Sequence, residues 1–478
     1  MTATPPLHSD VDFDLTVTIT ASETMPNGGE VTTLSADTVI TVPVIVNAVA
    51  DAPSVANTSS TVDEDTATVV GDAISYGLVD TDGSEVISAV TVTGIPVGAT
   101  YGVTPSGTGT AVVTPLMGGG GFTITGTEAD IRATLDSFTF TPAANDDSNV
   151  TLGVAVTATD SNGDTATTSS VHTLNVAAIA DAPVGSGTGT GNEDTAIAVP
   201  VSVGVSDTDG SETITQVMIE APAGVVLGGF GPSGASVNQA GQTWTLTGTQ
   251  AQIEAALAAM TATPPLHSDV DFDLTVTITA SETMPNGGEV TTLSADTVIT
   301  VPVIVNAVAD APSVANRSST VDEDTATVVG DAISYGLVDT DGSEVISAVT
   351  VTGIPVGATY GVTPSGTGTG LSRLLWAAAG LRLRALKPIF ARRLTAFTFT
   401  PAANDDSNVT LGVAVTATDL NGDTATTSSA HTLNGAAIAD APVGSGTGTG
   451  NEDTAIAVPV SVGVSDTDGS GDDHAGYD

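Results

Sequence analysis

The sequence contains no cysteine, and its eight lysines and arginines stand against 55 aspartates and glutamates, which gives a net charge of −47. Without cysteine there is no disulfide framework and no thiolate metal site, so metal ions remain as the means of cross-linking an extracellular fold. The scarcity of basic residues argues strongly against a nucleic-acid partner, because phosphate binding needs Lys and Arg. Carboxylates without countercharge repel one another in a compact state. We therefore expect an elongated shape or neutralisation by cations.

Aromatic residues make up only 3% of the chain, and such a composition leaves a disordered chain as an alternative. Abundant Val, Ile, Leu and Ala in regular patterns favour a folded core instead. No run of about 20 apolar residues occurs, so we expect no membrane insertion in this segment. No signal peptide opens the chain.

The chain repeats its own sequence. The stretch MTATPPLHSDVDFDLTVTITASETMPNGGEV begins at Met1 and again, unchanged, at Met260. A shorter period is marked by the tetrapeptide ADAP, whose first residues are Ala50, Ala180, Ala309 and Ala439. This period exceeds the 20–50 residues of solenoid repeats and is long enough for a folded domain. Because the starting Met has its counterpart inside a repeat, we expect the natural N-terminus to lie upstream.

These repeats divide the chain into modules. We define the first module as residues 50–179, the second as 180–308 and the third as 309–438. The first and third share one sequence type, and the second has another. Residues 1–49 match the C-terminal part of the second type, and residues 439–470 match its start, so 1–49 and 439–478 both read as truncated repeats.

One block breaks the repeat. Residues 370–393 have the length of their counterpart in the first module but unrelated chemistry. Plausible codons for Met-Gly-Gly-Gly, read one nucleotide later, give Trp-Ala-Ala-Ala, so we interpret the block as out-of-frame peptide from a sequencing error or gene decay. Residues 471–478 have the same signature. The alternative is a basic amphipathic helix. Six basic residues belong to this block: Arg373, Arg382, Arg384, Lys387, Arg392 and Arg393.

Each module contains short runs with period-two alternation, such as EVISAVTVTGI, FTFTP and VTLGVAVTAT, separated by Gly, Pro, Asn and Asp. About seven strands in about 130 residues fit a β-sandwich. Residues 126–138 and 248–260 show a helical pattern instead, with Ala129, Ile131 and Leu135 expected to pack on the sandwich. We predict an all-β protein of tandem Ig-like β-sandwich modules, each with one short helix. The glycine-rich stretch 185–191 is interpreted as a flexible hinge.

Carboxylates gather in four recurring elements. These are a Glu in an acidic run near each module start, a DTDGSE turn, a DSNGD or DLNGD turn before the last strand, and the Asp of ADAP. In that order, the candidate metal ligands are Glu64, Glu193 and Glu323; Asp80, Asp82, Glu85, Asp207, Asp209, Glu212, Asp339, Asp341 and Glu344; Asp160, Asn162, Asp164, Asp419, Asn421 and Asp423; Asp181 and Asp310.

Calcium suits these elements, because it takes six to eight oxygen ligands and alternating Asp and Asn on a tight Gly turn present oxygens on one side. Magnesium prefers to keep its waters, and zinc needs His or Cys, which are few here. The alternative is that Asp, Asn and Gly simply form polar turns. The DTDGSE element also resembles the start of an EF-hand loop, but the position-12 Glu and the flanking helices are missing.

The segment VTATDSNGDTATTSSVHTLNVAAIADAP resembles the end of a cadherin-type domain, in which an ATD turn precedes two strands and an acidic linker. The resemblance implies cadherin-like modules with calcium at the junctions, held by a module-start Glu, a turn Asp and a linker Asp. Carried over to this chain, the implied ligands are Glu64, Asp160 and Asp181, with Glu193, Glu323 and Asp419 in parallel roles. The linker ADAP lacks one ligand pair of the cadherin pattern. The second module has Glu282 and Glu289 in its turn, which implies a weaker site.

The DTDGSE element and the helix pattern GT-x-A-x-I-x-x-x-L resemble the tandem repeats of bacterial type I-secreted, RTX-like surface adhesins. This resemblance implies a calcium-stabilised repeat region of a large secreted or cell-surface adhesin, with homophilic, host or biofilm-matrix contacts. The alternatives are a passive extracellular spacer that displays a catalytic or carbohydrate-binding domain encoded elsewhere, and an unproductive gene fragment. We expect no enzymatic activity, because GxSxG and HExxH are absent and the histidines lie outside known motifs. We expect these histidines to be polar surface residues.

Overall fold

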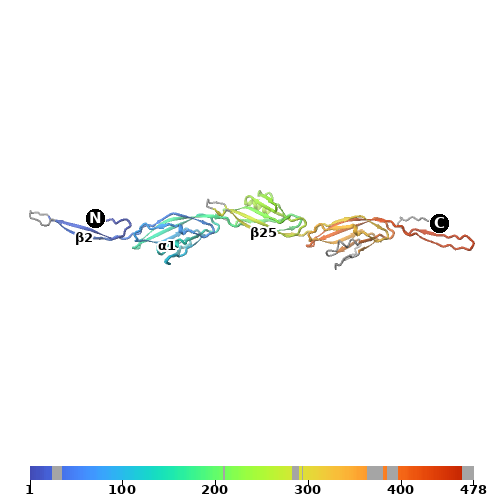
Figure 1. Ribbon diagram of the computed structural model, residues 1–478, viewed down its shortest axis with the longest axis horizontal. Helices are drawn as coiled ribbons and strands as arrows, with labels where there is room; N and C mark the ends of the chain where they lie inside the picture. Colours follow the sequence, from blue (N-terminus) through green and yellow to red (C-terminus); the bar gives the residue numbers. More distant parts are fainter. Residues whose placement is uncertain are drawn as a thin grey trace.

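The computed structural model describes residues 1–23, 35–207, 210–282, 290–292, 294–362, 380–384 and 397–465. Within these residues, strands dominate and two short α-helices occur. Figure 1 shows three β-sandwich units placed end to end in an elongated molecule, with a two-stranded ribbon at each extremity. The predicted all-β class of tandem sandwiches is confirmed, and the first and second modules each carry one short helix.

The first module consists of a large sheet facing a small one. The large sheet has the order β4-β13-β12-β7-β10-β9, and the small sheet has the order β5-β11-β8. Strand β4 pairs with β13 in parallel. The strands are β3 (Ser54–Val55), β4 (Thr58–Asp63), β5 (Thr68–Val69), β6 (Tyr76–Gly77), β7 (Glu85–Thr93), β8 (Thr100–Gly102), β9 (Val112–Pro115), β10 (Gly121–Thr125), β11 (Thr139–Thr141), β12 (Val150–Asp160) and β13 (Thr165–Ile179), with α1 at Glu128–Leu135.

The second module repeats this plan, with a large sheet of order β15-β25-β23-β18-β21-β20 and a small sheet of order β16-β22-β19. Strand β24 (Val290–Thr292) adds in parallel to β13 of the first module. The other elements are β14 (Val184–Gly187), β15 (Gly189–Asn192), β16 (Ile197–Ala198), β17 (Val201–Gly204), β18 (Glu212–Glu220), β19 (Val226–Gly228), β20 (Ser236–Ala240), β21 (Thr243–Thr247), α2 (Gln250–Ala258), β22 (Thr261–Thr263), β23 (Phe272–Glu282) and β25 (Ser294–Asn306).

The third module has sheets of order β27-β35-β34-β30-β32 and β28-β33-β31. Its strands are β26 (Ser313–Asn316), β27 (Ser319–Asp322), β28 (Thr327–Val328), β29 (Ile333–Gly336), β30 (Val345–Thr352), β31 (Thr359–Val362), β32 (Gly380–Arg384), β33 (Phe397–Thr400), β34 (Val409–Thr418) and β35 (Thr424–Ala436).

Strand β32 lies inside the block interpreted as out of frame. It pairs with β30 so that Gly380 faces Thr352, which is the register in which Gly121 of β10 faces Thr93 of β7. A strand therefore occupies this place in the third module although the sequence differs. The remainder of the block, and residues 471–478, lie outside the described residues.

Period-two patterning produces the core. Along β12, Leu152, Val154, Val156 and Ala158 all point inward and are buried, as expected for a strand with one face on the core. The same side chains form one apolar cluster with Ile131 and Leu135 of α1. Burial of these apolar faces is the main favourable contribution to folding.

Ala129, which we expected to pack on the sandwich, is exposed, and that prediction was wrong. Its neighbour Asp130 is buried instead, because its carboxylate accepts hydrogen bonds from the N–H and hydroxyl groups of Thr108 and Thr110. Those bonds lower the pKa of Asp130. Helix α1 begins after Thr127, whose hydroxyl accepts from the N–H of Asp130.

The glycine-rich stretch 185–191 is not a hinge. It forms most of β14 and β15, which pair with β17 and β25. A Cβ atom on Gly185 would lie 2.4 Å from Cδ1 of Ile278 and 3.1 Å from the carbonyl oxygen of Ser202. Glycine is present here because the strand lies directly on the core.

The N-terminal ribbon pairs β1 (Phe13–Ser22) with β2 (Ser35–Val44), and the C-terminal ribbon pairs β36 (Val443–Gly446) with β37 (Val460–Gly463). Strand β1 has the sequence of residues 272–281 in β23, yet its packing differs. Ile19 is 52% exposed, whereas its counterpart Ile278 is fully buried. The difference arises because β23 lies between β18 and β25, whereas β1 has only β2 beside it.

Candidate metal sites at the module junctions

The acidic elements converge where one module meets the next. We call the contact of residues 1–49 with the first module the first junction, and that of the first with the second module the second junction. The third junction joins the second and third modules, and the fourth joins the third module to residues 439–465. Each intact module therefore has an entry end and an exit end.

The module-start Glu lies at the exit end. Glu64 follows β4, which runs parallel to the final part of β13, so the two strands end together. The N–H of Glu64 donates to the carbonyl of Ala177 at 3.0 Å, and its Oε1 accepts from the N–H of Ile179. Glu193 accepts from the N–H of Val308 at 2.7 Å in the second module. Glu323 accepts in the same way from the N–H of Ile438 at 2.5 Å.

The Glu of DTDGSE lies at the entry end and holds the linker. Glu85 accepts from the N–H of Asp51, Glu212 from that of Asp181, and Glu344 from that of Asp310. Each of these glutamates is buried. The linker Asp is thereby fixed to the module that follows it.

The turn acid stands opposite this Glu. Asp160 at the end of β12 faces Glu85 of β7, and Glu282 of β23 faces Glu212 of β18. Glu282 therefore occupies in the second module the position that Asp160 occupies in the first. Glu289 lies outside the described residues.

This arrangement corrects the ligand grouping implied by the cadherin resemblance. Glu64 and Asp181 both lie at the second junction, each near Asp207. Asp160 lies at the opposite end of the first module, beside Glu85 and Asp51. The reason is topological, because β12 runs from the exit end to the entry end while β4 runs the other way. In the same way, Asp419 lies with Glu344 at the third junction.

Part of each acidic loop serves as turn structure. In the DTDGSE turn, Asp80 accepts from the N–H of Asp82 at 2.9 Å, and Asp82 from that of Ser84 at 2.8 Å. The third module repeats these bonds among Asp339, Asp341 and Ser343. These are Asx-type turns. Asp209 is outside the described residues.

The DSNGD turn folds around its first carboxylate. Oδ1 of Asp160 accepts from the N–H groups of Asn162 at 3.1 Å and Asp164 at 2.9 Å. The amide of Asn162 then donates to the carbonyl of Ala48 at 2.6 Å, which ties the turn to the preceding linker. Asp164 itself is exposed.

The DLNGD turn of the third module has the same form. Oδ1 of Asp419 accepts from the N–H groups of Asn421 and Asp423, and the Asn421 amide donates to the carbonyl of Ala307 at 2.6 Å. Asn162 and Asn421 thus contribute by holding the linker backbone.

Seven of the described carboxylates at the junctions each have one oxygen atom without a hydrogen-bond partner. While the first oxygen accepts a backbone N–H, the second is shielded from solvent and has no hydrogen-bond partner. Burying an uncompensated anionic oxygen is strongly unfavourable, so these atoms mark a place for a cation. They are Oε2 of Glu64, Glu85, Glu193, Glu212 and Glu344, and Oδ2 of Asp160 and Asp419.

Burial also changes the acidity of these groups. It raises the pKa of Glu64 to about 7, although the N–H of Ile179 opposes the shift, and nearby Asp207 and Glu282 raise it further. Burial likewise raises the pKa of Glu193 to about 7. Buried carboxylates that crowd one another favour the protonated state unless a cation is bound.

Several carboxylates approach closely enough to share one ion. Glu64, Asp207 and Glu282 at the second junction offer oxygens within 4.8 Å of one another. At the third junction Glu193, Asp339 and Asp341 do the same. Donor sets made only of oxygen suit a hard cation such as calcium. The residues present therefore fit calcium.

Sequence reasoning missed three junction residues, which are His8, His267 and Asn145. Nδ1 of His8 lies 2.6 Å from Oδ2 of Asp51, and His267 contacts the linker Asp310 in the same way. Asn145 donates to Oδ2 of Asp181 at 2.7 Å in the second junction. A comparison of TPAAN with TPPLH, which end at Asn145 and His267, provides the signal that would have found them.

We expected the histidines to lie on the surface, but His172 and His431, the other two in the described residues, are buried. His172 is fully buried on β13, and its ring nitrogens lie 2.6 Å from the hydroxyl of Thr58 and 3.1 Å from that of Ser60. Burial lowers the pKa of His172. His431 is buried at the matching place in the third module.

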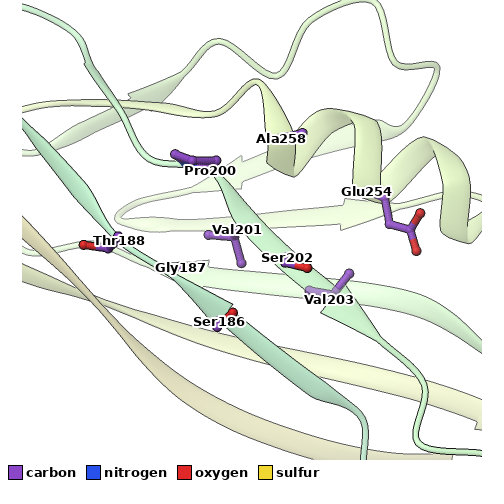
Figure 2. A pocket seen from close by; sticks show the side chains of 9 residues that line it. All are labelled: Ser186, Gly187, Thr188, Pro200, Val201, Ser202, Val203, Glu254 and Ala258. Carbon is purple, nitrogen blue, oxygen red and sulfur yellow. The ribbon is translucent and has the colours of Figure 1, made fainter.

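A pocket in the second module lies between β14, β17 and α2, with Glu254 of α2 at its rim (Figure 2). Glu254 accepts a hydrogen bond from Gln250 at 2.8 Å, and the rest of the lining is glycine, proline, alanine, valine, serine and threonine. This lining offers no pair of carboxylates for acid–base chemistry. No long apolar helix suited to crossing a membrane occurs among the described residues.

No protein-family model and no curated protein matches the chain. Several solved structures are similar to it. A protocadherin gammaB7 EC3-6 cis-dimer structure is 16% identical, with a TM-score of 0.35 over 88% of this chain and 84% of that one. Mouse cadherin-23 EC22-24 is 13% identical, with a TM-score of 0.33 over 81% and 99%. Such TM-scores describe a loose correspondence, so the fold assignment rests on the sheets themselves.

Proposed function

We propose that this chain is a calcium-stabilised repeat region of a large secreted or cell-surface bacterial adhesin. The observation that carries the proposal is the set of shielded carboxylate oxygens at the junctions. At the third junction, Oε2 of Glu193 comes from the second module, while Oε2 of Glu344 and Oδ2 of Asp419 come from the third. A cation bound there would join two modules.

Calcium fits this role best because the donors are carboxylate oxygens contributed by both sides of a junction. Binding to the folded state stabilises it by about 2.7 kcal/mol per site when free calcium is 100 times the Kd. Because the junction carboxylates repel one another without the ion, calcium would stiffen the array outside the cell, where calcium is plentiful.

The elongated series of modules supports a stalk that carries contacts away from a surface (Figure 1). We propose an extracellular or cell-surface location, with homophilic contacts or contacts to host or biofilm-matrix surfaces. The resemblance to cadherin-type junctions and to RTX-like adhesin repeats points in the same direction. In the alternative, the same stiff array is a passive spacer for a domain encoded elsewhere.

The test is a calcium titration of the full chain, followed by thermal unfolding and small-angle X-ray scattering, with magnesium as the control. A rise in Tm together with a longer, stiffer particle supports calcium-bound junctions. If calcium changes neither Tm nor the length of the particle, the acidic loops are only turns and the calcium proposal fails. Self-association or attachment to cells in calcium then separates an adhesin from a spacer, because a passive spacer gives neither.

A further inference from the structure

Consecutive junctions have different side chains at one equivalent position of the backbone. Asn145 and His267 both have a left-handed conformation, with φ of 54° and 55°. The N–H of Asn145 donates to Oδ1 of Asp65 at 3.0 Å, and the N–H of His267 donates to Oδ1 of Asp194 at 2.6 Å. The two residues are therefore structural counterparts, one at the exit of each module type.

Their side chains meet the linker differently. The Asn145 amide nitrogen can only donate, and it does so to Oδ2 of Asp181. Nδ1 of His267 lies 2.6 Å from Oδ2 of Asp310 and 3.2 Å from Oδ2 of Asp194. Nδ1 of His267 and Oδ2 of Asp310 are shielded from solvent. They form an ion pair with each other when the imidazole is protonated, but neither has a partner with hydrogen-bond geometry. A neutral imidazole carries a nitrogen lone pair that binds metals.

We propose that the junctions which follow a module of the second type hold a second site, for a transition-metal cation of the zinc class. At the third junction its ligands are Nδ1 of His267 and the carboxylates of Asp194 and Asp310, which offer donors within 4.8 Å of one another. Zinc binds His nitrogen and carboxylate oxygen at about 2.0–2.2 Å in a tetrahedral site. Donors in such a site lie about 3.3 Å apart, so the existing contacts need only small adjustments.

The site recurs at the first junction. There His8 and Asp51 are the counterparts of His267 and Asp310, with Nδ1 of His8 2.6 Å from Oδ2 of Asp51. The third member of the group is Asp80 of the DTDGSE turn, in place of an acid from the preceding module. Three protein ligands leave the fourth position of a tetrahedral zinc for water. The small number of histidines in the sequence argued against zinc, but the structure places one imidazole beside two carboxylates at this junction.

The other junctions provide a built-in comparison. The counterpart of Asn145 at the fourth junction is Asn404, which donates to Oδ2 of Asp440 at 2.8 Å. An amide side chain gives only an oxygen to a metal, and here its nitrogen faces the carboxylate. Zinc-class sites therefore alternate along the array with junctions that lack an imidazole. This inference does not depend on calcium binding at the buried glutamates.

The experiment uses the full chain after chelator treatment, in excess magnesium to occupy non-specific carboxylates. Cobalt(II) serves as the spectroscopic probe, since it takes zinc's place in tetrahedral sites and absorbs visible light there, and zinc competes it out. His8→Asn and His267→Asn each replace the imidazole by the side chain that the other junctions use. Asn145→His is the reciprocal variant.

Wild type is expected to show the tetrahedral cobalt absorption. Each single variant should lose part of it, and the double variant should bind zinc at least about 100-fold more weakly, since even second-shell losses cost 10–100-fold. Asn145→His should add absorption. If the double variant binds cobalt and zinc as wild type does, the proposal is overturned. Calcium-dependent Tm, measured on the same variants, reports on the calcium proposal separately, and circular dichroism confirms that the variants are folded.

Discussion

Glu212 and Glu282 stand directly opposite each other at the paired ends of β18 and β23, and both are buried. Like charges that face each other across two strands are destabilising. The pair lies beside Asp181, because Glu212 accepts a hydrogen bond from the N–H of Asp181. Its counterpart at the first junction is Glu85 opposite Asp160. The fold thus repeats an unfavourable charge pair at the start of the first and second modules.

Removing one of these charges gives the first prediction. In the absence of calcium, Glu212→Gln should raise Tm, because it ends the repulsion with Glu282 while the amide oxygen still accepts from Asp181. In saturating calcium the variant should gain less stability than wild type. Glu220→Gln, at an exposed position on the same strand, is the control and should leave the calcium response unchanged. Equal calcium responses of Glu212→Gln and wild type would contradict a bound ion there.

The second prediction concerns pH. Burial raises the pKa of Glu64 and Glu193 to about 7, above their ordinary value of 4.5. Protons therefore bind the folded calcium-free protein more tightly than the unfolded one, and this stabilisation is complete below pH 4.5 and lost as pH rises through 7. Calcium-free Tm should be higher at pH 5 than at pH 8. With calcium, the stabilisation that the ion provides should weaken on acidification, because protons compete for the same oxygens.

The double variant Glu64→Gln/Glu193→Gln is the matched control for this pH profile. It should flatten the calcium-free rise in Tm between pH 8 and pH 5. An unchanged profile would assign the pH dependence to the overall negative charge of the chain rather than to these two glutamates.

The third prediction concerns the linker contact of Asn421. Its amide donates to the carbonyl of Ala307, across the boundary between the second and third modules. Asn421→Ala should destabilise the third junction by about 1 kcal/mol, the usual worth of one hydrogen bond. Scattering should show greater bending of the particle. The control is Asn434→Ala, at an exposed position on β35, which should change neither the stability nor the bending. If both variants bend equally, the hydrogen bond of Asn421 to Ala307 does not stiffen the junction.

The fourth prediction tests the glycine strand. Gly185→Ala should destabilise the second module by about 1–3 kcal/mol, the usual effect of overpacking a core, because the new methyl group meets Cδ1 of Ile278. Gly204→Ala provides the comparison, since its nearest atom, Cγ2 of Val184, lies at 3.7 Å. Urea denaturation should separate the two variants. Equal stabilities of the two variants would contradict the packing of Gly185 on the core and favour a hinge at residues 185–191.

The sequence predicted those parts of the fold that depend on local pattern. Val154 and Val156 of β12 stand two residues apart, and Ile131 and Leu135 lie one helical turn apart, so their burial follows from their spacing. The strand β15 could not be predicted in this way, because glycine has no side chain from which to recognise a period. Its place is decided by the parallel pairing with β25, far along the chain.

The candidate ligands were recognised by type, but their grouping was not. Whether Asp160 joins Glu64 depends on which way β4 and β12 run, and this is decided by pairings between residues more than 100 positions apart. His267 was missed for a similar reason, since Asp194 and Asp310 are distant in sequence. Local motifs identify the donors, while the topology determines which donors share an ion.

The two copies of FDLTVTITAS, in β1 and β23, have consequences for hydrogen exchange. They give a peptide of one mass from two environments, since β23 is hydrogen-bonded on both sides and β1 only to β2. Amides that face solvent in one copy are locked between strands in the other. Deuterium uptake of this peptide should split into two mass envelopes of equal intensity. The slower envelope reports the ten residues inside the complete sandwich of the second module. The faster envelope reports the same ten residues in the two-stranded ribbon.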